Sequence, residues 1–102
     1  MFGLSSQLRR AAVAVAANIA EGSQRQYLKE YVQFLYVAKG SLTEAEYYIH
    51  LALELGYITP PEAEQLATLE AETARTLHGL IRWLEDQTAS GIARKDDLPK
   101  KS

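Results

Sequence analysis

The sequence contains no cysteine, which excludes disulfides and thiolate metal sites and is typical of a reducing compartment. It also lacks a long hydrophobic run: the longest, residues 11–17, is far shorter than the roughly 20 residues that span a bilayer. Residues 1–8 have no basic start leading into an apolar stretch, so they do not resemble a secretory signal. These absences predict a cytoplasmic location.

Catalytic motifs are missing as well. His50 and His78 have no partner at H-x-x-x-H or E-x-x-H spacing, and the six glycines are too scattered for a phosphate loop or a dinucleotide fingerprint. The sequence therefore predicts a protein that is not an enzyme and that uses no cofactor or metal.

Helical periodicity is what the sequence does have. Apolar residues recur every three or four positions in three stretches, which predicts helices at about residues 6–20, 24–55 and 60–87. Short connections make neighbouring helices antiparallel. The predicted fold class is all-α, an up-down helical bundle over residues 1–87. Residues 88–102 are polar without an apolar period, and we expect this tail to be disordered.

Local signals set the helix boundaries. Gly22 is expected to end the first helix in a left-handed cap, and the S-x-x-Q pattern from Ser23 predicts a capping box at the start of the second. Gly56 is expected to close the second helix. The T-x-x-E pattern from Thr59, with proline next to it, predicts a capping box at the start of the third.

The net charge of −2 is unevenly distributed. Residues 1–39 carry a surplus of three positive charges, and residues 40–87 carry an excess of seven negative charges. A uniformly basic nucleic-acid binder is excluded, whereas a basic patch near the N-terminus is not. For Arg9 and Arg10, pairing with a carboxylate such as Glu30 is the alternative to phosphate contact. The nucleic-acid candidates are Arg9, Arg10, Arg25, Lys29 and Lys39.

The second predicted helix carries more apolar surface than two neighbouring helices can cover. Between residues 27 and 38, apolar or aromatic side chains surround most of its circumference. Such a helix is buried on more than one side, which favours self-association. The alternative is that its tyrosines are half-exposed, with their ring faces on the core. The candidates for an interface between copies are Leu28, Val32, Tyr36, Tyr47 and Tyr48.

Four blocks resemble a known family: Q-L-R-R-A-A at 7–12, N-I-A-E-G at 18–22, F-L at 34–35 with A-x-G-S-L-x-E at 38–44, and L-G-Y at 55–57. They are similar to the bacterial four-helix-bundle family of 23S rRNA intervening-sequence proteins and diversity-generating retroelement accessory proteins. The resemblance implies a four-helix bundle assembled into a ring-shaped homopentamer without catalysis. For the retroelement branch it implies a basic ring that engages nucleic acid and a reverse transcriptase.

The sequence departs from this pattern in two ways. The family has a helix before the Q-x-R-R block, whereas here Met1 lies six residues ahead of Gln7. Either the true start lies upstream, or the first helix is missing and another chain fills the vacant face. The chain is also net acidic, unlike the basic accessory proteins.

Two functions are compatible with these features. The first is a homo-oligomeric scaffold or adaptor for a protein partner, favoured by the apolar surplus of the second helix. The second is an RNA- or DNA-binding oligomer, favoured by the basic N-terminal third and by the resemblance, with a reverse-transcriptase-type protein as a further partner.

Overall fold

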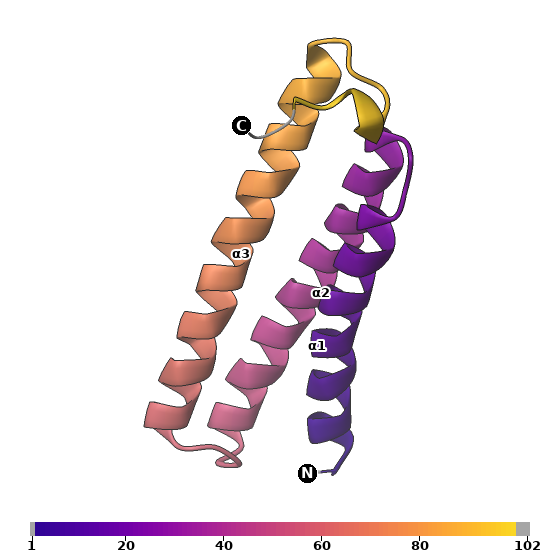
Figure 1. The fold of residues 1–102 in the computed structure, drawn as a ribbon. Coiled ribbons are helices and arrows are strands. Elements are labelled where there is room, and N and C mark those ends of the chain that lie inside the picture. Colours follow the sequence, from indigo (N-terminus) through magenta and orange to yellow (C-terminus); the bar gives the residue numbers. More distant parts are fainter. Residues whose placement is uncertain (1, 100–102) are drawn as a thin grey trace.

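The computed structural model describes residues 2–99, which form three helices joined by short connections (Figure 1). They are α1 (Phe2–Ser23), α2 (Leu28–Glu54) and α3 (Pro60–Ala89), followed by the short 3-10 helix η1 (Lys95–Asp97). Neighbouring helices run antiparallel and make a rod of 50 × 22 × 21 Å. The predicted all-α class is confirmed. None of the helices within the described residues is long and apolar enough to cross a membrane.

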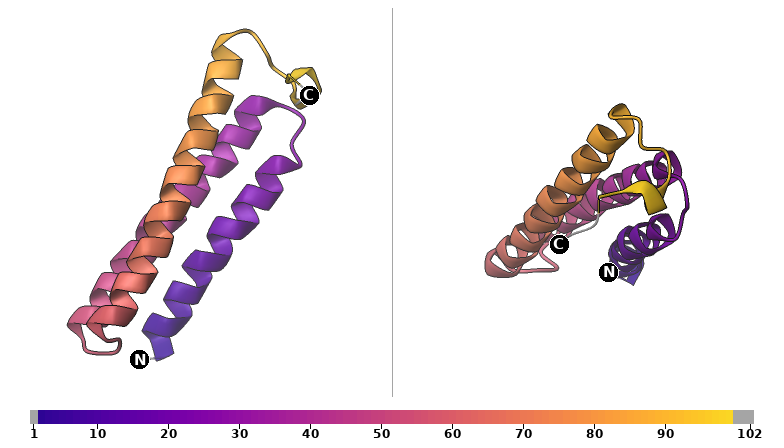
Figure 2. Two further views of the ribbon diagram at one scale, coloured as in Figure 1. Left: turned by 60° about the vertical axis from the view of Figure 1, so that its left-hand side comes forward. Right: turned by 45° about the horizontal axis from the view of Figure 1, so that its top comes forward.

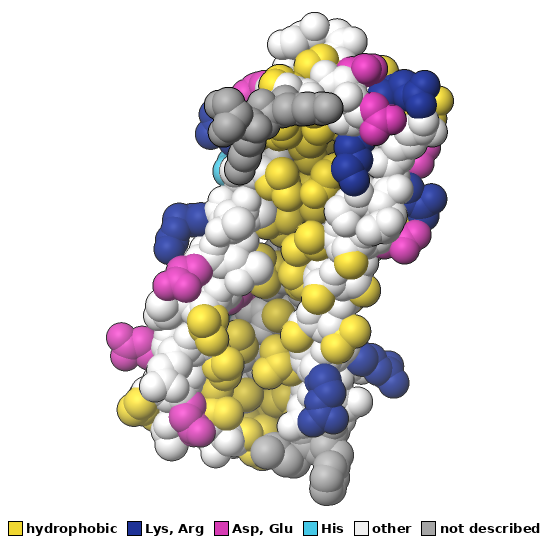
Figure 3. Space-filling model, in the orientation of Figure 1, with side chains coloured by type: hydrophobic (Ala, Val, Ile, Leu, Met, Phe, Trp, Pro, Cys, Tyr) yellow, Lys and Arg dark blue, Asp and Glu magenta, His cyan; other side chains and the backbone are white. Residues whose placement is uncertain are grey.

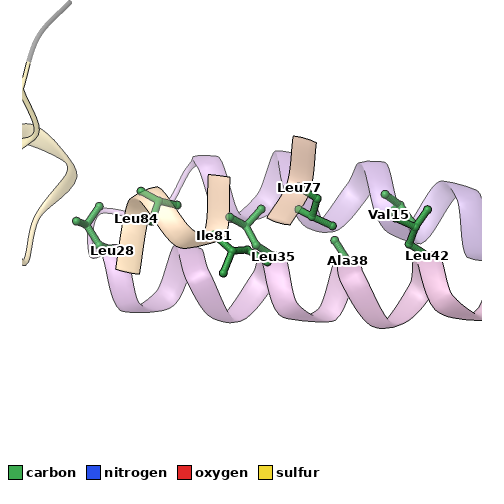
Figure 4. Packing of buried hydrophobic residues seen from close by; sticks show 8 residues of the cluster. All are labelled: Val15, Leu28, Leu35, Ala38, Leu42, Leu77, Ile81 and Leu84. Atoms are coloured by element: carbon green, nitrogen blue, oxygen red, sulfur yellow. The ribbon is translucent and has the colours of Figure 1, made fainter. Parts of the chain in front are cut away.

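The core lies where α1 and α3 each pack against α2. Figure 2 shows the two outer helices on different sides of α2, which is therefore the central element. Full burial of a side chain the size of leucine stabilises a fold by about 1.5–3 kcal/mol. The buried cluster, drawn in Figure 4, consists of Val15 from α1, of Leu28, Leu35, Ala38 and Leu42 from α2, and of Leu77, Ile81 and Leu84 from α3.

The connection between α1 and α2 differs from the prediction. α1 continues through Gly22 without a positive φ, and the Ser23 hydroxyl donates to the carbonyl oxygen of Ala20 at 2.7 Å. α2 starts only at Leu28, and its N-cap residue, Tyr27, makes no side-chain cap. The predicted left-handed cap at Gly22 and capping box at Ser23 are therefore wrong. The physical reason is that the last turn of α1, by staying helical, packs against α2.

The connection between α2 and α3 follows the prediction. Gly56 has φ 76°, and the N–H of Tyr57 donates to the carbonyl oxygen of Ala52 at 2.9 Å, as in a Schellman motif. The capping box is present at the start of α3: the Glu62 N–H donates to Thr59 Oγ1 at 3.3 Å, and the Thr59 N–H donates to Glu62 Oε1 at 2.8 Å. Both boundaries depend on residues within one turn of each other.

The tail is ordered over the part that the structure describes, so the predicted disorder is wrong for residues 88–99. Gly91, with φ 95°, reverses the chain after α3, and the Ile92 N–H donates to the carbonyl oxygen of Gln87 at 3.1 Å. This is a second Schellman motif. The tail then crosses the end of the bundle (Figure 1), where Ile92 and Leu98 pack against the core. Residues 100–102 of the predicted tail lie outside the described residues.

Backbone hydrogen bonds hold the tail against the start of α2. The Leu28 N–H donates to the carbonyl oxygen of Ala93 at 2.9 Å, and the Lys95 N–H donates to the carbonyl oxygen of Gln26 at 2.8 Å. The first N–H groups of a helix have no partner within the helix. The carbonyl of Ala93 therefore takes the place of a side-chain cap, which explains how α2 starts without one.

Candidate interaction surfaces

An open apolar groove runs between α1 and α3 over the middle of α2. Figure 3 shows hydrophobic side chains as a continuous band along it, flanked by polar side chains on both outer helices. A hollow of about 370 Å³ within this groove is lined by Ile19, Leu77 and Leu80, with Glu72, Thr73 and Thr76 beside them. The groove exists because α1 and α3 both pack on α2 rather than on each other.

The predicted interface residues divide between the core and the surface. Leu28 is 0% exposed, so it is a core residue of its own chain and cannot contact another copy. Val32 is half-buried and packs against the same core. Tyr47 is 62% exposed, and its ring meets that of Tyr48 edge to face, with centroids 5.7 Å apart. Tyr47 thus remains on the surface of α2 beside the half-buried Tyr48, as expected for a helix that is not fully covered.

Tyr36 links α2 to α3. Its side chain is 45% exposed, and its hydroxyl donates to Glu85 Oε2 at 2.8 Å. This hydrogen bond to a carboxylate raises the pKa of Tyr36. The Lys39 ammonium lies 5.9 Å from the centre of the Tyr36 ring. The hydroxyl is therefore already engaged within the chain, while the ring remains available for contact.

Several exposed apolar side chains were not predicted as interface candidates. Helical periodicity singles out the buried seam of each helix, and it also predicted Leu69 as a seam residue, although the side chain of Leu69 is 61% exposed. Those with substantial exposure are Val13, Val37, Leu55, Leu69 and Trp83.

An acidic pocket of about 460 Å³ lies between α2 and α3. Its walls are largely apolar, and its carboxylates come from both helices. Burial raises the pKa of Glu70, and the nearby charge of Glu46 raises it further. Such a pocket suits an apolar group that carries a positive charge. The acidic pocket is lined by Ile49, Leu53, Pro60, Ala63 and Ala67, with Glu46, His50, Glu64 and Glu70.

The five predicted nucleic-acid contacts do not form one surface. Arg9 and Arg10 lie in the first half of α1, and Arg25 follows its end, roughly 20 Å further along the axis. Arg25 is also committed internally: its Nη2 is 2.6 Å from Glu21 Oε1, and its guanidinium lies 4.8 Å from the centre of the Phe34 ring. A phosphate contact by Arg25 would have to compete with both interactions.

The tail brings further basic residues to the end that carries Arg25 and Lys29. Arg94 lies over the Tyr27 ring at 6.0 Å, and the Lys95 ammonium donates to the carbonyl oxygen of Ser23. The neighbouring tail residues 96 and 97 are both aspartates. This end is therefore mixed in charge rather than uniformly basic, and sequence reasoning missed it because the tail was expected to be disordered.

Metal chemistry has no evident centre in the part of the chain that the structure describes. Within residues 2–99, no group of three or more histidine, cysteine, aspartate or glutamate side chains could hold a metal ion. His50 and His78 are both exposed and lie on different helices.

Comparison with known proteins decides the family. A family model described as 23S rRNA-intervening sequence protein matches residues 1–79. The chain belongs to this family.

The family relation extends to a solved structure. The chain is similar to a protein of unknown function from the S23 ribosomal protein family of Bacteroides thetaiotaomicron VPI-5482. The two share 28% identity with a TM-score of 0.77, over 79% of this chain and 75% of that chain. No curated protein matches the chain.

The blocks that carry the family resemblance serve packing in this structure. Ala11, from the first block, is buried. Gly22, from the second, lies where an added Cβ would be 2.8 Å from the Cβ of Phe34, a residue of the third. Residues of the first three blocks therefore hold α1 against α2, whereas the fourth block forms the turn after α2.

Proposed function

We propose that this member of the 23S rRNA-intervening sequence protein family is a non-catalytic assembly protein. Copies associate into a homo-oligomer, in the form of a ring as the family resemblance implies, and the oligomer acts as a scaffold for a protein partner. The observation that carries this proposal is the apolar groove between α1 and α3 (Figure 3). Contiguous apolar surface on a small chain marks a protein interface.

The energetics favour coverage of the groove. Apolar surface removed from water contributes about 25 cal/mol per Å², so covering the groove along the rod stabilises an assembly by several kcal/mol before the cost of association. A protein of 102 residues has only a modest stability margin of its own. Docking of a further helix on this side would also complete a four-helix arrangement around one core.

The oligomeric state tests the proposal directly. One chain has a mass of 11.4 kDa, and we expect a multiple of that mass in sedimentation equilibrium at micromolar concentration. A matched pair of variants locates the contact. Thr76 lines the groove and Thr68 does not, yet both are exposed residues of α3 whose hydroxyls donate to the carbonyl four residues earlier.

Thr76→Lys should dissociate the assembly, because it places a charge within the apolar groove, whereas Thr68→Lys should leave it intact. Both variants should keep the helical circular dichroism of the parent protein. A monomeric parent at micromolar concentration contradicts the proposal.

Nucleic-acid binding is the second candidate. It is supported by the family description, which refers to 23S rRNA, and by basic residues at the α1–α2 connection and in the tail. Phosphate contacts would make the affinity for RNA fall steeply with salt. Fluorescence anisotropy of a labelled RNA between 50 and 200 mM salt is the test, and a flat response would remove this candidate.

A further inference from the structure

We propose that copies of this chain dock side by side through two different surfaces, a heterologous or head-to-tail contact. The outer face of α1 from one copy lies in the acidic pocket of the next copy. The inference rests on the proposed self-assembly and adds a contact between copies that lies outside the groove. It is argued from the charge, exposure and position of these two surfaces on one protomer.

The outer face of α1 is basic at its edges and apolar at its centre. Val13 is 61% exposed, Arg9 and Arg10 are exposed beside it, and Ser6 and Ala14 complete a shallow hollow. α1 packs into the core by a different face, which holds the buried Ala11 and Val15. Within residues 2–99, neither arginine forms an ion pair, because the salt bridge found there joins Arg25 and Glu21. The cations of the outer face are therefore available to another chain.

The acidic pocket has the complementary character. Ile49, Leu53 and Ala67 give it apolar walls that suit a side chain such as Val13. Glu46 and Glu70 repel one another there, and no cation from the described residues forms a salt bridge with either. A positive charge supplied by a second copy would relieve this repulsion.

The two surfaces lie at the same level of the rod. The first half of α1, the second half of α2 and the first half of α3 share one end of the molecule in Figure 1. The acidic pocket is lined by α2 and α3 alone, so it lies on a different side of the protomer from the outer face of α1. Side-by-side copies related by rotation about an axis parallel to the rod can therefore bring the two surfaces together. Repetition of a contact between two different surfaces gives a closed ring when the rotation from copy to copy adds up to a full turn.

Apolar and charged residues are expected to contribute differently to this contact, because the charges are exposed. Exposed ion pairs add little affinity, so the burial of Val13 and of the pocket walls supplies most of it. The arginines and glutamates fix how the two copies are aligned, since arrangements that bring like charges together are disfavoured.

Charge reversal tests this docking on the full chain. Arg9→Glu/Arg10→Glu makes both surfaces acidic, and Glu46→Lys/Glu70→Lys makes both basic. Each variant alone should associate at least about tenfold more weakly than the parent protein in sedimentation. The controls change the net charge equally at exposed sites outside both surfaces: Arg75→Glu/Arg82→Glu for the first variant, and Glu44→Lys/Asp86→Lys for the second. Both controls should assemble like the parent protein.

Mixing the two reversed variants provides the decisive observation. The basic α1 face of one then meets the acidic pocket of the other, and the remaining pair of surfaces meets with both charges reversed. Assembly should return fully in a single chain that carries all four substitutions. The mixture should recover binding between the two variants, but a ring with an odd number of copies would retain one like-charged contact. If reversal perturbs folding, as judged by circular dichroism, Arg9→Gln/Arg10→Gln and Glu46→Gln/Glu70→Gln should weaken assembly in the same direction.

The outcomes separate this inference from the proposed function. A parent protein that assembles but is indifferent to both reversals overturns the head-to-tail docking and leaves self-assembly standing. Reversed variants that dissociate, together with a folded chain carrying all four substitutions that fails to assemble, also overturn it. A monomeric parent protein overturns both.

Discussion

At the scale of single residues, Gly22 shows how a backbone position can be fixed by a neighbouring helix. An added Cβ would lie 2.8 Å from the Cβ of Phe34 and 3.0 Å from Cδ1 of Tyr31, with the Tyr31 carbonyl oxygen 3.2 Å away. Two of these atoms belong to backbone or to a Cβ and cannot swing aside. Glycine is needed here for close approach, since its backbone conformation is that of an ordinary helix.

Gly22→Ala should therefore destabilise the protein. Helix propensity alone favours alanine by about 1 kcal/mol, but displacement of the α1 turn from α2 should cost more and leave a net loss of about 1–3 kcal/mol. Urea denaturation measures the change. Gly79→Ala is the matched control, because Gly79 is a helical glycine with nothing within 4 Å of its added Cβ, and it should be neutral or stabilising. Equal stability of the two variants would show that α1 is not packed this closely.

The sequence predicted a structural role for Gly22 but the wrong one. A glycine between two apolar stretches matches a helix terminator, and the S-x-x-Q pattern that follows strengthens that interpretation. The contact that decides the matter is made with residues on another helix, whose approach the local sequence does not encode. The same holds for Leu28. Its apolar character predicted burial against another copy, whereas the neighbours that bury it belong to its own chain.

At the scale of elements, the two ends of the α2–α3 connection were predictable because their interactions are local. The capping box at Thr59 and Glu62 and the left-handed Gly56 each involve residues within one turn of one another. The start of α2 was not predictable in this way, because its cap is supplied by Ala93 from the far end of the chain. Gly91 followed by the apolar Ile92 is the sequence signal that could have revealed an ordered turn after α3.

The capping box at the start of α3 should make the free energy of unfolding depend on pH in the acidic range. Hydrogen bonds from the Thr59 backbone and then from its side chain lower the pKa of Glu62 below the usual value of 4.5. A depressed pKa in the folded state means that the charged form contributes stability above pH 4.5, and that this contribution is lost as the pH falls through the folded pKa. Glutamine also forms a capping box, so Glu62→Gln removes only the charge.

The parent protein should therefore be more stable than Glu62→Gln at neutral pH, and the difference should disappear in acid. Free energies of unfolding from urea titrations between pH 7 and pH 3 provide the measurement. Glu44→Gln, at an exposed site within α2, is the control and should show no such convergence. A difference that stays constant across the titration would mean that the carboxylate acts by something other than its charge.

At the scale of the whole molecule, the tail fastens the end of α3 to the α1–α2 connection. It closes one end of the core with Ile92 and Leu98, and it supplies backbone partners to Leu28 and Gln26. A chain ending at Ser90 should lose about 2–3 kcal/mol of stability relative to a chain ending at Pro99, from lost apolar burial and a lost helix cap. Thermal and urea unfolding of the two chains measure this difference. Equal stability would mean that the tail contributes nothing to the fold in solution.

The charge distribution and the number of helices were predictable at this scale, whereas the positions of the groove and of the acidic pocket were not. The segmental charge imbalance foretold a basic N-terminal third, but only the antiparallel path of the chain places its arginines level with the acidic pocket. The surplus apolar surface of the second helix was predicted from residues 27–38, and Tyr27, Tyr36 and Val37 of that stretch are exposed. The groove itself involves α1 and α3, and its existence follows from where those helices sit around α2.

The tail carries one evolutionary consequence. It meets α2 through the carbonyl of residue 93 and the N–H of residue 95, which almost any amino acid can provide. Selection that acts on peptide groups leaves the side chain at position 93 free to vary, whereas position 95 excludes proline, which has no N–H to donate. Diverged relatives can therefore keep these two backbone contacts with other residues at position 93, while the packing of Ile92 and Leu98 limits the sequence on either side.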